Sequence, residues 1–86
     1  MRLLIIEDDE RLLTTLTRVL TEEGHSVSVS ETGPAGLAAG VADEFDVIVL
    51  DVMLPGLDGN LVCRGLRAAD VQTPVLMLTA LGDVDR

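Results

Sequence analysis

Two uninterrupted apolar runs constrain the fold of this chain more than any other feature of its sequence. They are LLII at residues 3–6 and VIVL at residues 47–50. Strands with one wet face alternate apolar and polar residues, whereas unbroken runs are typical of strands covered on both faces of a parallel sheet. Because parallel neighbours need long crossover connections, usually helices, we expect an α/β chain with helices on both faces of the sheet.

The rest of the sequence carries the turn and cap residues expected between alternating strands and helices. Gly24 follows a helical apolar pattern, and Thr32 before Pro34 has the order of a helix N-cap and first turn. The alternating SVSVS at 26–30 favours a strand near a sheet edge. We predict one domain over residues 1–86, with strands at about 2–7, 26–30, 46–51 and 75–79, and helices at about 10–23, 34–43 and 59–69.

The helical period also predicts which side chains face the sheet. In the first helix these are Leu12, Leu16, Val19 and Leu20, and in the third they are Leu61, Val62, Leu66 and Ala69. Gly36 and Gly40 lower the helix propensity of the second helix, unless they allow its close approach to the sheet.

Acidic residues dominate the charge of the chain. The 86 residues carry a formal net charge of −9, from 15 acidic and 6 basic side chains. This balance argues against a nucleic-acid or anionic-membrane surface on this segment. The single cysteine, Cys63, excludes a disulfide framework and is interpreted as a buried, inert thiol. With no apolar run of transmembrane length, about 18 residues, we expect a cytoplasmic protein.

Polar side chains follow the ends of three predicted strands. Glu7 and Asp8 follow the first strand, Asp51 follows VIVL, and Thr79 ends the last strand. Ligands of an open parallel sheet bind beyond its carboxyl ends, where neighbouring strands lie about 4.8 Å apart. Three carboxylates there repel one another unless pKa values rise or a cation neutralises them. Oxygen ligands favour Mg²⁺, whereas the lone histidine and lone cysteine are too few for zinc.

A carboxylate beside Mg²⁺ is also a nucleophile toward phosphorus. Asp51 is the candidate acceptor, Asp8 the direct metal ligand and Glu7 a ligand through water. The hydroxyl of Thr79 is placed to donate to a phosphoryl oxygen. The alternative for Glu7 and Asp8 is an acidic helix start that the helix dipole favours, and Thr79 has the alternative of a strand end without a task.

Three motifs resemble a known family. IIEDDE at 5–10, VIVLDVMLPGLDG at 47–59 and TPVLMLTA at 73–80 resemble the receiver domain of bacterial two-component response regulators, most like the winged-helix DNA-binding (OmpR/PhoB-type) subfamily. The resemblance implies a flavodoxin-like, doubly wound parallel sheet with strand order 2-1-3-4 and with the fifth strand and last helices missing.

The resemblance also implies roles for individual residues. Asp51 corresponds to the phosphoacceptor, and Glu7 and Asp8 to the acidic pair that binds Mg²⁺ together with Asp51. The backbone carbonyl of Met53 corresponds to a further metal ligand, and Thr79 to the switch hydroxyl. Asp58, next to Gly59 in the same loop, is better explained as an N-cap of the third helix than as a ligand.

The chain departs from the family pattern at its end. It stops soon after Thr79 and contains no lysine, so the fifth strand with its phosphate-binding lysine is not represented. We therefore expect an open apolar edge at 75–79 and a partly uncovered sheet face, both of which favour self-association. Whether Asp51 accepts phosphate without the lysine is left open.

The implied function is that of a phosphoryl-accepting signalling domain, not an enzyme. A sensor histidine kinase would be its partner, and a DNA-binding domain outside this segment its output. One alternative is a receiver fragment that binds Mg²⁺ and self-associates without productive phosphorylation. A less favoured alternative is an aspartate-nucleophile phosphatase, which requires a second acid two residues after the nucleophile, where this chain has Met53.

Overall fold

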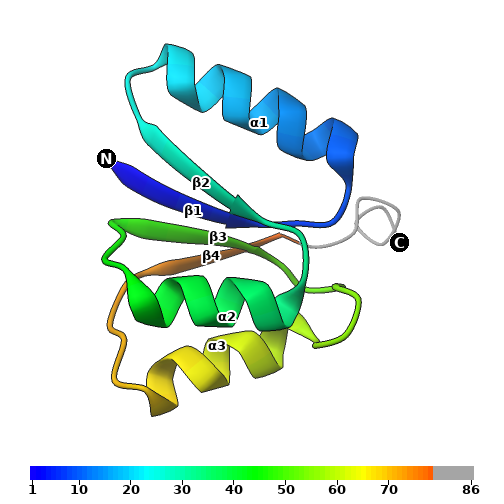
Figure 1. Ribbon diagram of the computed structural model, residues 1–86, viewed down its shortest axis with the longest axis vertical. Coiled ribbons are helices and arrows are strands. Elements are labelled where there is room, and N and C mark those ends of the chain that lie inside the picture. Colours follow the sequence, from blue (N-terminus) through cyan, green and yellow to red (C-terminus); the bar gives the residue numbers. More distant parts are fainter. Residues whose placement is uncertain (79–86) are drawn as a thin grey trace.

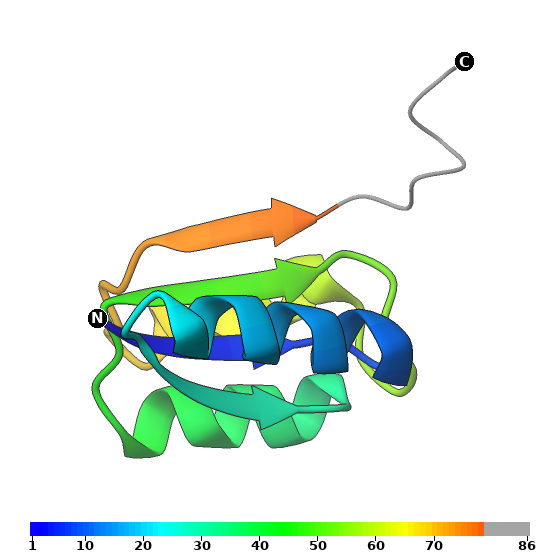
Figure 2. The same ribbon diagram turned by 90° about the horizontal axis from the view of Figure 1, so that it is seen from above.

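The computed structural model describes residues 1–78, in which a four-stranded parallel sheet carries three helices (Figure 1). The strands are β1 (Arg2–Ile6), β2 (Ser26–Ser30), β3 (Val47–Asp51) and β4 (Val75–Leu78), in the spatial order β2-β1-β3-β4. The helices are α1 (Glu10–Glu22), α2 (Gly33–Ala42) and α3 (Gly59–Ala68). The predicted α/β class and strand order are therefore confirmed, and all four strands point the same way in Figure 2.

The helices form two layers, with α1 on one face of the sheet and α2 and α3 together on the other (Figure 1). The pairing of Leu4 with Ile48 and of Ile6 with Leu50 aligns β1 beside β3. These side chains form the fully buried core with Val62 and Leu66 of α3. The apolar runs are continuous because their alternate residues face different helical layers.

The glycines of α2 allow that helix to lie close to its neighbours, which is the alternative that the sequence left open for them. A Cβ added at Gly36 would clash with the side chain of Ile6, and one added at Gly40 would lie 2.7 Å from Leu66 Cδ2. Larger side chains would push α2 outward, so the low helix propensity of glycine is offset by packing.

Side-chain caps set the start of each helix. Asp9 accepts hydrogen bonds from two N–H groups at the start of α1, and Thr32 accepts one from Ala35 in α2. Asp58 accepts the N–H of Asn60 in α3, which confirms its predicted role as an N-cap. Gly24, with φ of 95°, follows the end of α1 as predicted.

The predicted sheet-facing residues of two helices are confirmed in part: Leu16 and Leu20 of α1 are half-buried. Leu13 is the buried residue of α1, at 6% exposure, whereas Leu12 is 38% exposed and Val19 is also exposed. Leu13 lies on the same face as Leu16, three residues later, and that face rather than the one through Leu12 meets the sheet. In α3, Val62 and Leu66 are fully buried as predicted, whereas the predicted Leu61 and Ala69 are exposed.

Apolar side chains remain exposed on the sheet as well as on the helices. Val49 pairs with both Ile5 and Leu76, so the three side chains share the face that carries α1. Ile5 is buried there, but Leu76 on β4 is 58% exposed.

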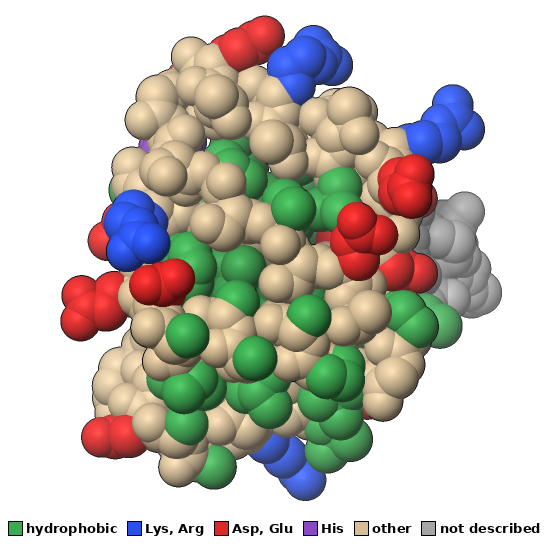
Figure 3. Space-filling view, viewed as in Figure 1, with side chains coloured by type: hydrophobic (Ala, Val, Ile, Leu, Met, Phe, Trp, Pro, Cys, Tyr) green, Lys and Arg blue, Asp and Glu red, His purple; other side chains and the backbone are tan. Residues whose placement is uncertain are grey.

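On the opposite side of the molecule, hydrophobic side chains gather over α2 and α3 (Figure 3). Within residues 1–78, no helix is long and apolar enough to cross a bilayer.

Candidate functional site

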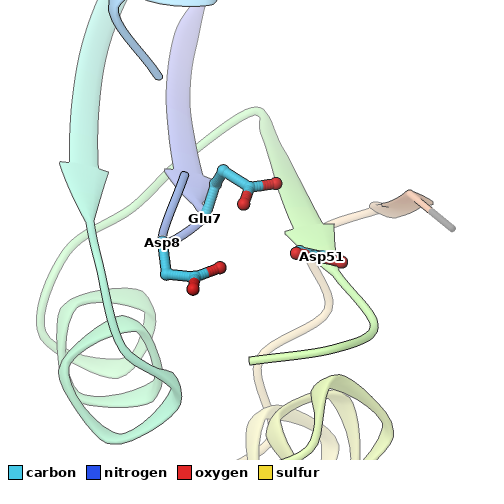
Figure 4. A group of neighbouring side chains, drawn as sticks. All are labelled: Glu7, Asp8 and Asp51. Carbon is cyan, nitrogen blue, oxygen red and sulfur yellow. The ribbon is translucent and has the colours of Figure 1, made fainter. Parts of the chain in front are cut away.

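Three carboxylates converge where β1 and β3 end. Ile6 and Leu50 are paired neighbours, so the residues that follow them leave the sheet side by side. One carboxylate oxygen from each of Glu7, Asp8 and Asp51 lies within 4.8 Å of the others. Figure 4 shows Glu7 and Asp8 extending from the end of β1 toward Asp51 at the end of β3. The structure thus brings together the three acidic residues that the sequence singles out.

The three carboxylates differ in their exposure to water. Glu7 is 4% exposed, Asp51 is half-buried and Asp8 is exposed. Burial raises the pKa of Glu7, an effect that the N–H of Asp9 partly opposes by donating to Glu7 Oε2 at 2.9 Å. The nearby charge of Asp51 raises the pKa of Glu7 further. A proton or a bound cation therefore stabilises this cluster.

The loop at 52–58 forms a wall beside the carboxylates. The Met53 N–H donates to Asp51 Oδ1 at 3.0 Å, which orients the Asp51 carboxylate. A cavity of about 450 Å³ lies between this loop and the first strand's acidic end; it is lined by Asp8, Val52, Met53, Leu54, Pro55 and Asp58. The cavity offers space for a small anionic group next to the carboxylates.

A second, larger cavity lies at the opposite end of the strands. Its volume is about 550 Å³, and its lining includes Arg2, Phe45 and Asp70. The Arg2 guanidinium lies 5.3 Å from the centre of the Phe45 ring, so this arginine already has a partner. Size alone does not identify the site, because the acidic cluster borders the smaller cavity through Asp8.

The sequence also singles out Thr79, Met53 and Cys63. Thr79 lies outside the described residues. Met53 is exposed and lies in the loop two residues after Asp51. Cys63 lies on α3, half-buried rather than buried as predicted, because the buried face of that helix runs through Val62.

Asp9 is the N-cap of α1, a role that was not assigned from the sequence because Asp9 belongs to the acidic run at 7–10. Its side chain caps α1, accepting the N–H groups of Arg11 and Leu12, while its own N–H binds Glu7. An aspartate just before a helical apolar pattern was the signal available for this cap.

The fold and this site define an open parallel α/β protein with an acidic crevice at the carboxyl edge of its sheet. Residues 3–86 match the family model of the response regulator receiver domain. The chain belongs to this family, as its three motifs predict.

Curated relatives are similar along nearly the whole chain. The chain is 51% identical over 83 residues to the transcriptional regulatory protein TcrA of Mycobacterium tuberculosis, covering 96% of this chain and 33% of that protein. It is 40% identical over 85 residues to the transcriptional regulatory protein CusR of Escherichia coli, covering 99% of this chain and 37% of that protein. The chain therefore spans about a third of the length of these relatives.

Solved receiver domains share the fold. The receiver domain of the sensor histidine kinase PA1611 from Pseudomonas aeruginosa, with a magnesium ion coordinated in its active site cleft, matches with a TM-score of 0.90 at 27% identity, covering 98% of this chain and 70% of that one. The BeF3-activated N-terminal receiver domain of RstA from Klebsiella pneumoniae matches with a TM-score of 0.87 at 33% identity, covering 99% and 71%.

Proposed function

We propose that the chain accepts a phosphoryl group on Asp51, with Mg²⁺ bound beside it, from a sensor histidine kinase. The observation that carries this proposal is the convergence of Glu7, Asp8 and Asp51 within 4.8 Å at the carboxyl edge of the sheet. The PA1611 receiver domain, which holds a magnesium ion in its cleft, and the BeF3-activated receiver of RstA support it by similarity. The chain then acts as a signalling domain rather than as an enzyme.

The donor set of this site fits Mg²⁺. All candidate ligands are oxygen atoms, and Mg²⁺ is usually held by one or two carboxylates with water completing its shell. Asp8 and Asp51 are the proposed direct ligands, Glu7 binds through water, and the backbone carbonyl of Met53 supplies a further oxygen. A dication also offsets the unfavourable burial of Glu7, whose raised pKa reports that cost.

Asp51 is held in a way that suits a nucleophile. Its Oδ1 accepts the Met53 N–H at 3.0 Å, which orients the carboxylate. In the proposed transfer an Asp51 carboxylate oxygen attacks phosphorus, a P–O bond forms, and the P–N bond of the donor phosphohistidine breaks. Mg²⁺, when bound, spreads the charge that develops on the phosphoryl oxygens. The exposed side of the crevice, at Asp8, leaves access for the donor.

The output of the signal belongs to another part of the parent protein. The relatives named as transcriptional regulators are about three times as long as this chain. We propose a winged-helix DNA-binding domain as that output, on the resemblance of residues 47–59 to the OmpR/PhoB-type subfamily. The formal charge of −9 disfavours nucleic-acid contact by this segment itself. Thr79 is the proposed switch hydroxyl that senses the phosphoryl group.

Self-association of the 86-residue chain is a further part of the proposal. Leu76 is 58% exposed on β4, at one edge of the sheet and on its partly uncovered face. Open apolar edges template pairing with another chain, so a second copy is the proposed occupant. The alternative in which the chain binds Mg²⁺ and self-associates without productive phosphorylation remains the rival for this segment.

Intact-mass spectrometry after incubation with acetyl phosphate and Mg²⁺ tests the proposal. We expect a phosphate-sized mass gain in the wild-type chain and none in Asp51→Asn, which keeps the shape of the acceptor. Asp58→Asn is the matched control, because it removes one acid of the same cavity that is assigned a capping role. No gain in the wild-type chain, with Mg²⁺ binding intact, would favour the rival function.

A further inference from the structure

The loop that carries Met53 is anchored at both of its ends. At its start, the Met53 N–H binds Asp51 Oδ1 at 3.0 Å. At its end, the Gly59 N–H donates to the Val52 carbonyl at 2.8 Å, which draws the two ends of the loop together. These bonds join the two ends of the loop, and the residues between them depend on other contacts for their position.

The second half of this loop, at Gly56 and Leu57, lies directly against the start of α2. A Cβ built at Gly33 would lie 2.6 Å from Leu57 Cβ and 2.6 Å from the Leu57 carbonyl oxygen. The adjacent Gly56, with φ of +83°, turns the loop beside Pro34, whose Cδ would lie 3.7 Å from a Cβ at Gly56. A side chain at Gly33 would therefore not fit beside the loop unless the loop or the helix moved.

Glycine is needed at position 33 because a side chain there has no space, and not because the backbone conformation excludes other residues. Among the described residues, the glycines with positive φ are Gly24 and Gly56, so Gly33 has a backbone that alanine also adopts. Glycine within a helix is less favourable than alanine by up to about 1 kcal/mol, an effect that is smaller at a helix end. The close approach of Leu57 is thus the structural reason for glycine at this position.

We propose that Gly33 is a positioning residue for the metal site: the space left by its missing side chain sets how closely the loop at 52–58 lies to the carboxylates of β1 and β3. The proposal rests on the proposed function, because it concerns the same Mg²⁺ site. It assigns a role there to the first residue of α2, a helix that contributes none of the proposed ligands. Gly33 acts through Leu57 and the loop, and it touches neither the metal nor the phosphoryl group.

The substitution Gly33→Ala should displace the loop backbone. Rotation of the Leu57 side chain cannot relieve the contact, because one of the two nearest atoms is the Leu57 carbonyl oxygen. Ordinary contact begins near 3.4 Å, so the loop and the helix must separate by about 0.8 Å. Loss of support around metal ligands weakens metal binding by roughly 10- to 100-fold, and we expect a change near the lower figure for a loop displaced at one contact.

Gly40→Ala is the matched control for this substitution. It introduces the same methyl group at another buried glycine of α2. There the methyl group would meet Leu66 Cδ2 at 2.7 Å, the far end of a flexible side chain, and no atom of the loop. Both variants add helix propensity and crowd the α2 packing, but only Gly33→Ala moves the loop.

The test is a Mg²⁺ titration of the wild-type chain and both variants, followed by amide NMR and by calorimetry. Urea unfolding of each variant establishes that it is folded under the titration conditions. We expect Kd for Mg²⁺ to rise about 10-fold in Gly33→Ala and to stay within about twofold of wild type in Gly40→Ala. The metal-free Met53 amide resonance should shift in Gly33→Ala alone. Unchanged Mg²⁺ affinity and an unmoved Met53 resonance in folded Gly33→Ala would overturn this inference and leave the proposed function standing.

The wild-type chain supplies a second test that needs no substitution. If the loop transmits its position through Leu57, the Gly33 amide resonance should shift during the Mg²⁺ titration with the same apparent Kd as that of Met53, while that of Gly40 stays fixed. A stationary Gly33 resonance during saturable Mg²⁺ binding overturns the inference even if Gly33→Ala fails to fold. Absence of any Mg²⁺ binding by the wild-type chain overturns the proposed function and the inference together.

Discussion

Ile6 and Leu50 are paired neighbours on β1 and β3, and this pairing creates the acidic crevice. Each is fully buried, and each is followed by an acidic residue, Glu7 or Asp51. Because parallel strands leave the sheet in the same direction, the two carboxyl groups emerge together. A change in this register by one residue would turn one of them toward the other face of the sheet.

Mg²⁺ should stabilise the folded chain. A ligand at 100 times its Kd raises the free energy of unfolding by about 2.7 kcal/mol if it binds only the native state. We expect a gain of this order from urea unfolding at saturating Mg²⁺, and its loss in Asp8→Asn or Asp51→Asn. Asp58→Asn, which keeps a good N-cap residue, should retain the gain. An equal gain in all three variants would show that Mg²⁺ acts through general charge screening.

The buried Glu7 should make metal-free stability depend on pH. Its pKa is raised above the ordinary value of 4.5, chiefly by burial. The folded state therefore holds this proton more tightly than the unfolded state, so the contribution of Glu7 to stability falls as pH rises from 4.5 through the raised pKa.

Glu7→Gln removes this titration while preserving the shape of the side chain. We expect the variant to be more stable than wild type at neutral pH without Mg²⁺. The difference should shrink as pH falls through the raised pKa of Glu7 toward 4.5 and stay constant below that pH. Urea unfolding of both proteins across this pH range measures it. A difference that does not vary with pH would contradict the assignment.

Leu13 and Leu12 should differ in their contribution to stability. Leu13→Ala removes a buried side chain and should cost about 2–4 kcal/mol of unfolding free energy. Leu12→Ala, at the more exposed neighbouring position, should cost less than about 1 kcal/mol. Thermal or urea unfolding of the two variants compares the faces of α1 directly, and a larger loss in Leu12→Ala would favour the face predicted from the sequence.

Exposed Leu76 should promote self-association of the 86-residue chain. Sedimentation velocity at high micromolar concentration is expected to show dimers or larger species, and Leu76→Lys should shift the chain toward monomer. Leu61→Lys is the control, because Leu61 is an exposed leucine on α3, away from β4. A wild-type chain that stays monomeric throughout this range would sink the idea.

Local features of the sequence were sufficient to predict the elements and the acidic cluster. The unbroken runs before Glu7 and Asp51 predicted buried parallel strands, and Thr32, Asp58 and Gly24 predicted helix ends, because these signals depend on neighbours in sequence. The convergence of the carboxylates followed from one assumption, that β1 and β3 are adjacent. The structure bears that assumption out.

Other features were decided only by packing between distant segments. Whether Leu12 or Leu13 faces the sheet depends on how α1 rests on β1 and β2, and the helical period allows both. The extent to which Glu7 is buried, and so the direction of its pKa shift, depends on the layers that close over the end of β1. The contact of Gly33 with Leu57 joins residues that no local pattern connects. The sequence by itself determined the helices and strands of this protein and the placement of its acidic residues at strand ends. The helix faces and the fit of the loop at the site were decided only by the packing of the helices on the sheet, because that packing joins segments distant in sequence.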